Sequence, residues 1–130
     1  MNLLLDTNVL IWWAEDNPRI FSEAGEAIRN PDNIAYVSVA SAWEIAIKSG
    51  LGKLRGRTAA ASGWVPDAIA GASFELLPVA LAHALGVERL PRHHNDPFDR
   101  ILIAQALAEG MHLVTGDAIF ERYSVPVIRL

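Results

Sequence analysis

The sequence predicts an α/β fold in which helices cover both faces of a mostly parallel sheet of about four or five strands. Short apolar runs alternate with segments of helical periodicity, and the links between them are short. The chain has 130 residues, and 52% of them are hydrophobic. A chain of this size buries enough surface to fold without cross-links, so we expect one domain, 1–130.

The N-terminal part predicts one strand and two helices. NLLL (2–5) is a short apolar run typical of a buried strand, and a helix over 7–15 follows until Pro18 breaks the pattern. A second helix over 22–29 begins at Ser22, a residue type that caps helices. The chain then returns to the sheet.

The middle of the chain predicts a second strand–helix unit followed by a loop. IAYVS (34–38) is a strand candidate, and VASAWEIAIKSG (39–50) is a helix that ends near Gly50. LGKLRGRTAA (51–60) is rich in glycine and basic residues, which is typical of a loop. A further helix is expected at about 64–72.

The last part repeats this alternation. Its strongest element is the helix PFDRILIAQALAEG (97–110), with proline at its start and glycine at its end. The others are a strand at 74–79, a helix to about Gly86, a strand at 112–115, a short helix at 118–123 and a strand at 125–130. Ligand sites in such sheets lie outside the C-terminal strand ends, so function is sought there.

Composition excludes several classes of protein. There is no cysteine, so a bound metal would need oxygen or histidine ligands, and disulfides are excluded. The net charge of −4 is not that of a typical nucleic-acid binder. No apolar run approaches the roughly 18 residues of a membrane span, and Asp6 interrupts the apolar start, which lacks the basic segment of a signal peptide. We expect a cytoplasmic protein.

Acidic residues stand at the predicted strand ends and at one helix start. Asp6 and Asp117 follow strands, and each could serve only to cap the next helix. In HHNDPFDR, Asp96 could be the cap, Pro97 the first helical residue and Asp99 an acid of the first turn. The alternative is that these carboxylates converge on one site.

Glu44 fits a purely structural role least well. Its helix is apolar around much of its circumference, so we expect a partly buried carboxylate, whereas an exposed Glu44 would pair with Lys48 at i+4. A buried charge usually has a partner or a metal. Several carboxylates converging at one edge would raise each other's pKa, and a hard cation such as Mg²⁺ or Mn²⁺ would relieve the repulsion.

Four sequence blocks resemble the PIN domain in their order and spacing. They are LLLDTNVLIWW, SVASAWEIAIKSGLGKL, HHNDPFDRILIAQA and LVTGDAIFERY, and together they cover nearly the whole chain. They look most like the VapC-type toxins of bacterial type II toxin–antitoxin pairs. The resemblance implies a small α/β/α sandwich and a Mg²⁺- or Mn²⁺-dependent endoribonuclease that cuts single strands and so inhibits growth or translation.

The resemblance also implies roles for individual residues. The metal ligands would be Asp6, Glu44, Asp99 and the more variable Asp117. Asp96 lies one turn before Asp99 as a cap or supporting acid, and which of the two touches the metal stays open. Thr115 matches the polar residue two places before the last acid. These six residues form the predicted catalytic set.

Substrate contacts are expected from three residues. Asn8 matches the asparagine of the family's DTN, and Lys48 and Arg100 could contact phosphates. The basic loop at 53–57 could also do so or could be merely solvated. Gly116 stands where many relatives have a longer or basic residue, which removes a possible contact.

The resemblance implies a VapB-like antitoxin as partner, and a homodimer that could form a larger assembly with it. Of Trp12 and Trp13, we expect one in the core and the other in an apolar surface patch that marks a partner site. His93 and His94 could orient acids or bind phosphate, or could form hydrogen bonds within their loop.

Two other functions compete with this one. A strand followed by DTNVL is similar to the motif of haloacid dehalogenase-like phosphatases, but their second acid is replaced here by Asn8. A non-catalytic binding module could share the PIN fold, because fold does not imply function. Retention of all the acids speaks against the module.

Overall fold

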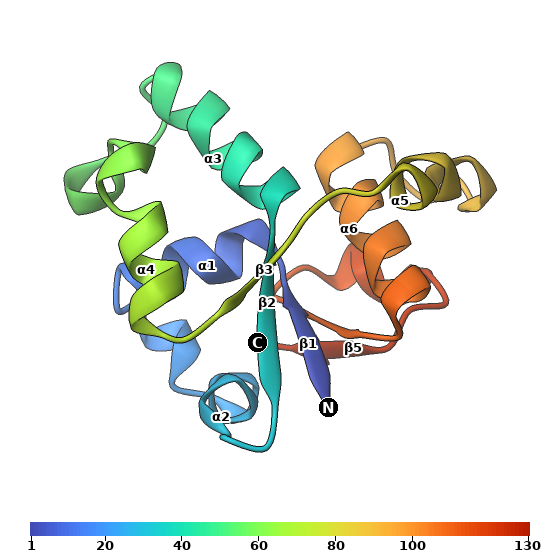
Figure 1. Ribbon diagram of the computed structural model, residues 1–130, viewed down its shortest axis with the longest axis horizontal. Coiled ribbons are helices and arrows are strands. Elements are labelled where there is room, and N and C mark those ends of the chain that lie inside the picture. Colours follow the sequence, from blue (N-terminus) through green and yellow to red (C-terminus); the bar gives the residue numbers. More distant parts are fainter.

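The computed structural model describes all residues, 1–130, and contains one five-stranded sheet (Figure 1). The strand order is β3-β2-β1-β4-β5, and every neighbouring pair is parallel. The strands are β1 (Asn2–Leu5), β2 (Ile34–Ser38), β3 (Glu75–Leu77), β4 (His112–Thr115) and β5 (Val127–Arg129). The mostly parallel sheet predicted from sequence is therefore entirely parallel, with β1 at its centre.

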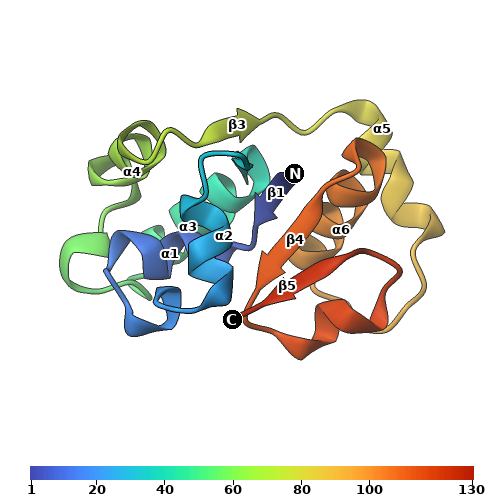
Figure 2. The same ribbon diagram turned by 90° about the horizontal axis from the view of Figure 1, so that it is seen from below.

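Helices cover both faces of the sheet. They are α1 (Thr7–Ala14), α2 (Glu23–Arg29), α3 (Val39–Gly50), α4 (Val65–Gly71), α5 (Leu81–Gly86) and α6 (Pro97–Glu109). Figures 1 and 2 show α1 to α4 on one side of the sheet and α5 and α6 on the other. The predicted three-layer α/β/α architecture is confirmed.

Alternation along the central strand divides the core into two. Leu3 and Leu5 of β1 pack on the side of α1 to α4, whereas Leu4 packs with Leu102 and Ile103 of α6 on the other side. All five side chains are buried. Successive strand residues point to opposite faces, so the NLLL run serves both cores.

The predicted elements are present, with small differences at the edges of the sheet. The strand expected at 74–79 is reduced to β3, because it lies at the edge and only its middle pairs with β2. The loop at 51–60 contains a 3₁₀ turn, Gly56–Thr58, and the short helix expected at 118–123 is a 3₁₀ turn, Ala118–Arg122. None of the helices combines the length and the apolar composition that a membrane span requires.

The start of α6 has the structure predicted for HHNDPFDR. Asp96 accepts hydrogen bonds from the backbone N–H of Phe98 (2.9 Å) and Asp99 (3.0 Å), and Pro97 occupies the first turn. The helix ends at Gly110, whose φ of 67° lies in the left-handed region that glycine adopts readily. The cap role of Asp96 is thus confirmed, and it gives Asp99 a fixed place in the first turn.

Replacing Gly25 of α2 by alanine is expected to destabilise the fold by about 1–3 kcal/mol, the usual cost of overpacking. A Cβ at Gly25 would collide with the backbone carbonyl of Ile20, which can move only if α2 separates from the preceding turn. Urea unfolding measures the loss. Gly71→Ala on α4 is the matched control, since no atom lies near a Cβ there. Equal stability of the two variants would contradict the prediction.

Candidate active site

Five carboxylates lie in and around one edge of the sheet, close enough for the charge of one to shift the pKa of another. Asp6 follows β1, Glu44 lies on α3 directly after β2, and Asp117 follows β4. Asp96 and Asp99 occupy the start of α6. The pKa of Asp99 responds to the charges of Asp96, Glu44 and Asp117, and that of Asp6 responds to Asp99 and Glu44. The structure therefore brings together all the acids that the sequence singled out.

Asp6 is the most buried of these acids. One carboxylate oxygen accepts the N–H of Thr7 (2.7 Å), so Asp6 also caps α1, and the other accepts the hydroxyl of Thr115 (2.8 Å). The pKa of Asp6 is raised from 3.8 to about 7, mainly by burial, with the charge of Asp99 adding to the effect and the Thr115 hydrogen bond opposing it. Asp6 is thus a buried carboxyl group that is not paired with any cationic side chain.

Thr115 links two acids. Its buried hydroxyl donates to Asp6 and accepts the backbone N–H of Asp117 (3.0 Å). Asp117 in turn caps the following 3₁₀ turn by accepting the N–H of Ile119 (3.0 Å). The hydrogen bonds therefore fix the positions of both strand-end acids.

The charged form of Asp99 is disfavoured in the same way as that of Asp6. The pKa of Asp99 is raised to about 7, mainly by burial and also by repulsion from Asp96, Glu44 and Asp117, whereas Lys48 opposes the shift. Lys48 bonds Glu44 across 3.1 Å and is the only lysine or arginine paired with any of the five acids. One ammonium group does not balance these charges.

The donor set fits a hydrated divalent cation. Carboxylate oxygens are hard ligands, and Mg²⁺ usually binds through one or two of them while keeping several waters. No three histidine or acidic side chains converge closely enough to form a ready cage. A cation here would therefore be held by few direct ligands, with the remaining acids acting through water.

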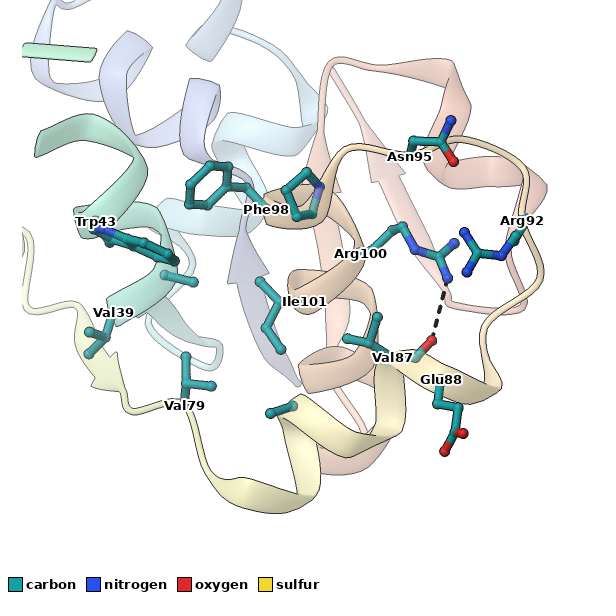
Figure 3. A pocket seen from close by; sticks show the side chains of 13 residues that line it. Val39, Trp43, Val79, Val87, Glu88, Arg92, Asn95, Phe98, Arg100 and Ile101 are labelled. Atoms are coloured by element: carbon teal, nitrogen blue, oxygen red, sulfur yellow. Dashed lines mark hydrogen bonds between the residues drawn. The ribbon is translucent and has the colours of Figure 1, made fainter. Parts of the chain in front are cut away.

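Two predicted substrate residues are occupied by other contacts. Lys48 is paired with Glu44, as in the helical alternative considered from the sequence. Arg100 is only 7% exposed, and its guanidinium points toward the segment that contains Val87 and Arg92 (Figure 3). It donates to the Tyr123 hydroxyl and to the carbonyls of Val87, Leu90, Pro91 and His94. These contacts hold the segment before α6, and a phosphate contact by Arg100 would have to replace some of them.

A cleft of about 740 Å³ opens beside Asp6 and Asp117. The exposed Asn8 lines it, as a substrate-contacting residue would require. Sequence reasoning missed Arg19, which also lines it: its guanidinium stacks over the Trp12 ring at 4.6 Å and makes no hydrogen bond or ion pair. No sequence pattern indicates this pair, because the residues meet only after the chain turns at 18–20.

Gly116 makes room for the stacked pair. A Cβ at this position would lie 2.7 and 2.8 Å from two ring carbons of Trp12. The short residue between Thr115 and Asp117 therefore does not leave a gap, because the indole of Trp12 fills the space that a larger side chain would take.

An apolar groove of about 780 Å³ runs between α3, α5 and α6 (Figure 3). Its walls include Val39, Val79 and Ile101, and the rings of Trp43 and Phe98 meet edge to face with centroids 5.2 Å apart. Trp43 is 63% exposed, whereas Trp12 and Trp13 are both partly buried. The exposed tryptophan thus lies on α3, and the expectation that it would be Trp12 or Trp13 is wrong.

Comparisons with solved structures find the same fold in chains of VapBC and FitAcB structures. VapBC2 from Rickettsia felis, bound to a DNA fragment from its promoter, gives a TM-score of 0.76 at 14% identity over 99% of this chain and 98% of that chain. VapBC-5 from Mycobacterium tuberculosis gives 0.64 at 22% identity over 99% and 98%. FitAcB from Neisseria gonorrhoeae gives 0.68 at 20% identity over 98% and 96%.

Sequence comparison identifies the family. No curated protein sequence matches the chain. The PIN domain family model, however, matches residues 3–126. This match spans all four acid-bearing blocks on which the resemblance rests, and the chain belongs to the PIN domain family.

Proposed function

We propose that this chain is a divalent-metal-dependent endoribonuclease that cuts single-stranded RNA, and that it is the toxin of a toxin–antitoxin pair. The observation that carries the proposal is the cluster of five carboxylates, two with a pKa of about 7, around a single lysine. Membership of the PIN family and the shared fold with VapBC chains support it. A bound Mg²⁺ or Mn²⁺ would polarise the phosphodiester and lower the pKa of a coordinated water.

The chain's own residues would divide the remaining work. Asp6, Glu44 and Asp99 would hold the cation directly or through water, and Asp117 would orient a water or support a second ion. Thr115 holds Asp6 by its hydroxyl, and Asp96 fixes the first turn of α6. Water would attack phosphorus and the 3′-oxygen would leave with a proton, which gives 5′-phosphate and 3′-hydroxyl ends.

The cleft beside the acids is the proposed path of the RNA. Arg19 is already ordered by stacking on Trp12, so its unpaired donors are available to a phosphate at little entropic cost. The exposed ring of Phe21 also borders the cleft and offers a stacking surface for a base. Separated strands expose phosphates and base faces together, which fits a single-stranded substrate.

Cleavage assays test the function. The purified chain is incubated with single-stranded RNA in Mn²⁺, in Mg²⁺ and in a chelator, and the ends are mapped. We expect cleavage only with metal, with 5′-phosphate ends, and slower cleavage of duplex RNA and of DNA. A folded chain that binds no Mn²⁺ and leaves RNA intact would favour the non-catalytic module.

Arg19→Ala is expected to raise KM for a single-stranded RNA about tenfold, the worth of one charged hydrogen bond, and to leave kcat within about twofold. The salt dependence of binding should also fall by about 0.7 in slope, as for one lost phosphate contact. Arg122→Ala is the matched control, because Arg122 is exposed and makes no ion pair or side-chain hydrogen bond. Equal KM values for both variants would contradict the proposed path.

The partners are also proposed. A second copy of the chain would cover the groove of Figure 3, whose exposed apolar residues, Trp43 and Val79, continue into Leu81 and Leu85 of α5. A VapB-like antitoxin would place a basic side chain against the acids, which lack cations. Sedimentation of the chain alone, and with any small protein encoded beside it, tests both partners.

A further inference from the structure

The segment before α6 contains a histidine, His94, that contacts both Tyr123 and Asp99. The Nδ1 of His94 lies 2.7 Å from the Tyr123 hydroxyl, and its Nε2 lies 3.0 Å from Oδ2 of Asp99. Tyr123 is buried, and the side chains of His94 and Asp99 are less than one-fifth exposed. The contact is therefore shielded from competition by solvent.

The direction of these hydrogen bonds follows from Arg100. A guanidinium only donates, so the Tyr123 oxygen accepts from Arg100, 3.2 Å away. The hydroxyl hydrogen of Tyr123 has one remaining acceptor, the Nδ1 of His94. With Nδ1 accepting, the neutral ring carries its hydrogen on Nε2 and donates it to Asp99.

We infer that His94 is a positioning residue for Asp99, set in the Nε2–H tautomer by Tyr123 and Arg100 and donating to one oxygen of that carboxylate. The other oxygen is then left free for the cation. The inference rests on the proposed function, since it gives Asp99 a ligand's role. It adds a residue that the cluster of acids does not include.

Asp99 needs such a donor. Asp96, Glu44 and Asp117 all repel its charge, and Lys48 is engaged by Glu44. Hydrogen-bond partners of this kind orient metal-binding side chains, and their loss typically costs about 10–100-fold in metal affinity.

The neighbouring His93 provides a control that distinguishes a positioning role of His94 from packing of the loop. The ring of His93 packs edge-on against Tyr123 with centroids 4.9 Å apart and makes no side-chain hydrogen bond. His93→Ala therefore removes a similar volume from the same segment while leaving Asp99 untouched, which makes it the matched control for His94→Ala.

Two measurements on the full chain test the inference. Proton–nitrogen NMR of the metal-free protein is expected to show His94 protonated at Nε2 only, and Tyr123→Phe is expected to abolish this preference. Calorimetry is expected to show Mn²⁺ affinity falling 10–100-fold in His94→Ala. His94→Gln, which keeps an N–H donor near the Nε2 position, should restore most of the affinity, and His93→Ala should not change it.

The outcomes separate this inference from the proposed function. The inference alone is overturned if the wild type binds Mn²⁺ and cuts RNA and the folded His94→Ala variant does both equally well. A His94 ring protonated at Nδ1 and not at Nε2 also overturns it. Wild-type protein that binds no Mn²⁺ overturns the proposed function and the positioning role with it. If His94→Ala does not fold, the ring nitrogen that carries the hydrogen of His94, compared between the wild type and Tyr123→Phe, still tests the inference.

Discussion

Replacing Asp99 by asparagine is expected to lower metal-dependent RNA cleavage by about a thousandfold. A bound cation contributes several kcal/mol to transition-state stabilisation, and each 1.36 kcal/mol is a factor of ten in rate. Asparagine keeps the shape of Asp99 but loses the charge that holds a cation. The loss should appear as a lower kcat and a weaker Mn²⁺ affinity by calorimetry.

The same change should not weaken the fold. In the metal-free protein, Asp99 is repelled by Asp96, Glu44 and Asp117, so removing its charge should leave the melting temperature unchanged or higher near pH 7.5. Asp32→Asn is the control for the charge change, because Asp32 is exposed in a distant loop. An Asp99→Asn protein with full cleavage would remove Asp99 from the site, and one with a large loss of stability would give it a structural role.

The metal-free protein is expected to lose stability as the pH rises from about 4 to about 7. The pKa of Asp6 is about 7 in the fold and close to 3.8 in the unfolded chain, so between these values the folded state holds a proton that the unfolded state has released. The free energy of unfolding therefore falls as pH rises through this range. For Asp6 the full change is on the order of 4 kcal/mol.

Comparison with Asp6→Asn isolates this effect from other titrations. We expect urea unfolding in chelator to show that the free energy of unfolding of the variant, relative to the wild type, is higher at pH 7.5 than at pH 4.5. Added Mn²⁺ should restore the wild type at pH 7.5 and have little effect on the variant, because the cation compensates the buried charge. If the difference in unfolding free energy between the two proteins did not change with pH, the pH-dependent loss of stability could not be assigned to Asp6.

The fold was predictable because its signals are local. NLLL is apolar enough to be buried on both faces, and the Asp96–Pro97 pair starts α6 with its cap and its fixed φ. The convergence of the acids was also predictable from the sequence, since three of them stand at or just after strands whose ends meet at one edge of the sheet. Capping leaves Asp6 and Asp117 able to take the proposed site roles, because a carboxylate oxygen that accepts one hydrogen bond keeps a second lone pair.

The contacts around the acids were not predictable because they join distant segments. Arg100 follows Asp99 directly and reads as a phosphate ligand, but on the helix its side chain points to the carbonyls of the segment 87–94. The pairing of Arg19 with Trp12 depends on a turn, and that of His94 with Tyr123 on the return from β4. Periodicity and capping carry no information about such contacts.

Because of the order of the strands, the cluster of acids forms only after strand β4 has docked on β1. Central β1 pairs with β4, so Leu3 and Leu5 are matched with His112 and Val114 from the far end of the sequence. Until β4 docks, Asp6 has no Thr115 beside it and Asp117 has no fixed place. Under the proposed function, a chain that lacks β4 would therefore have no assembled site, and loosening of β4 should abolish cleavage.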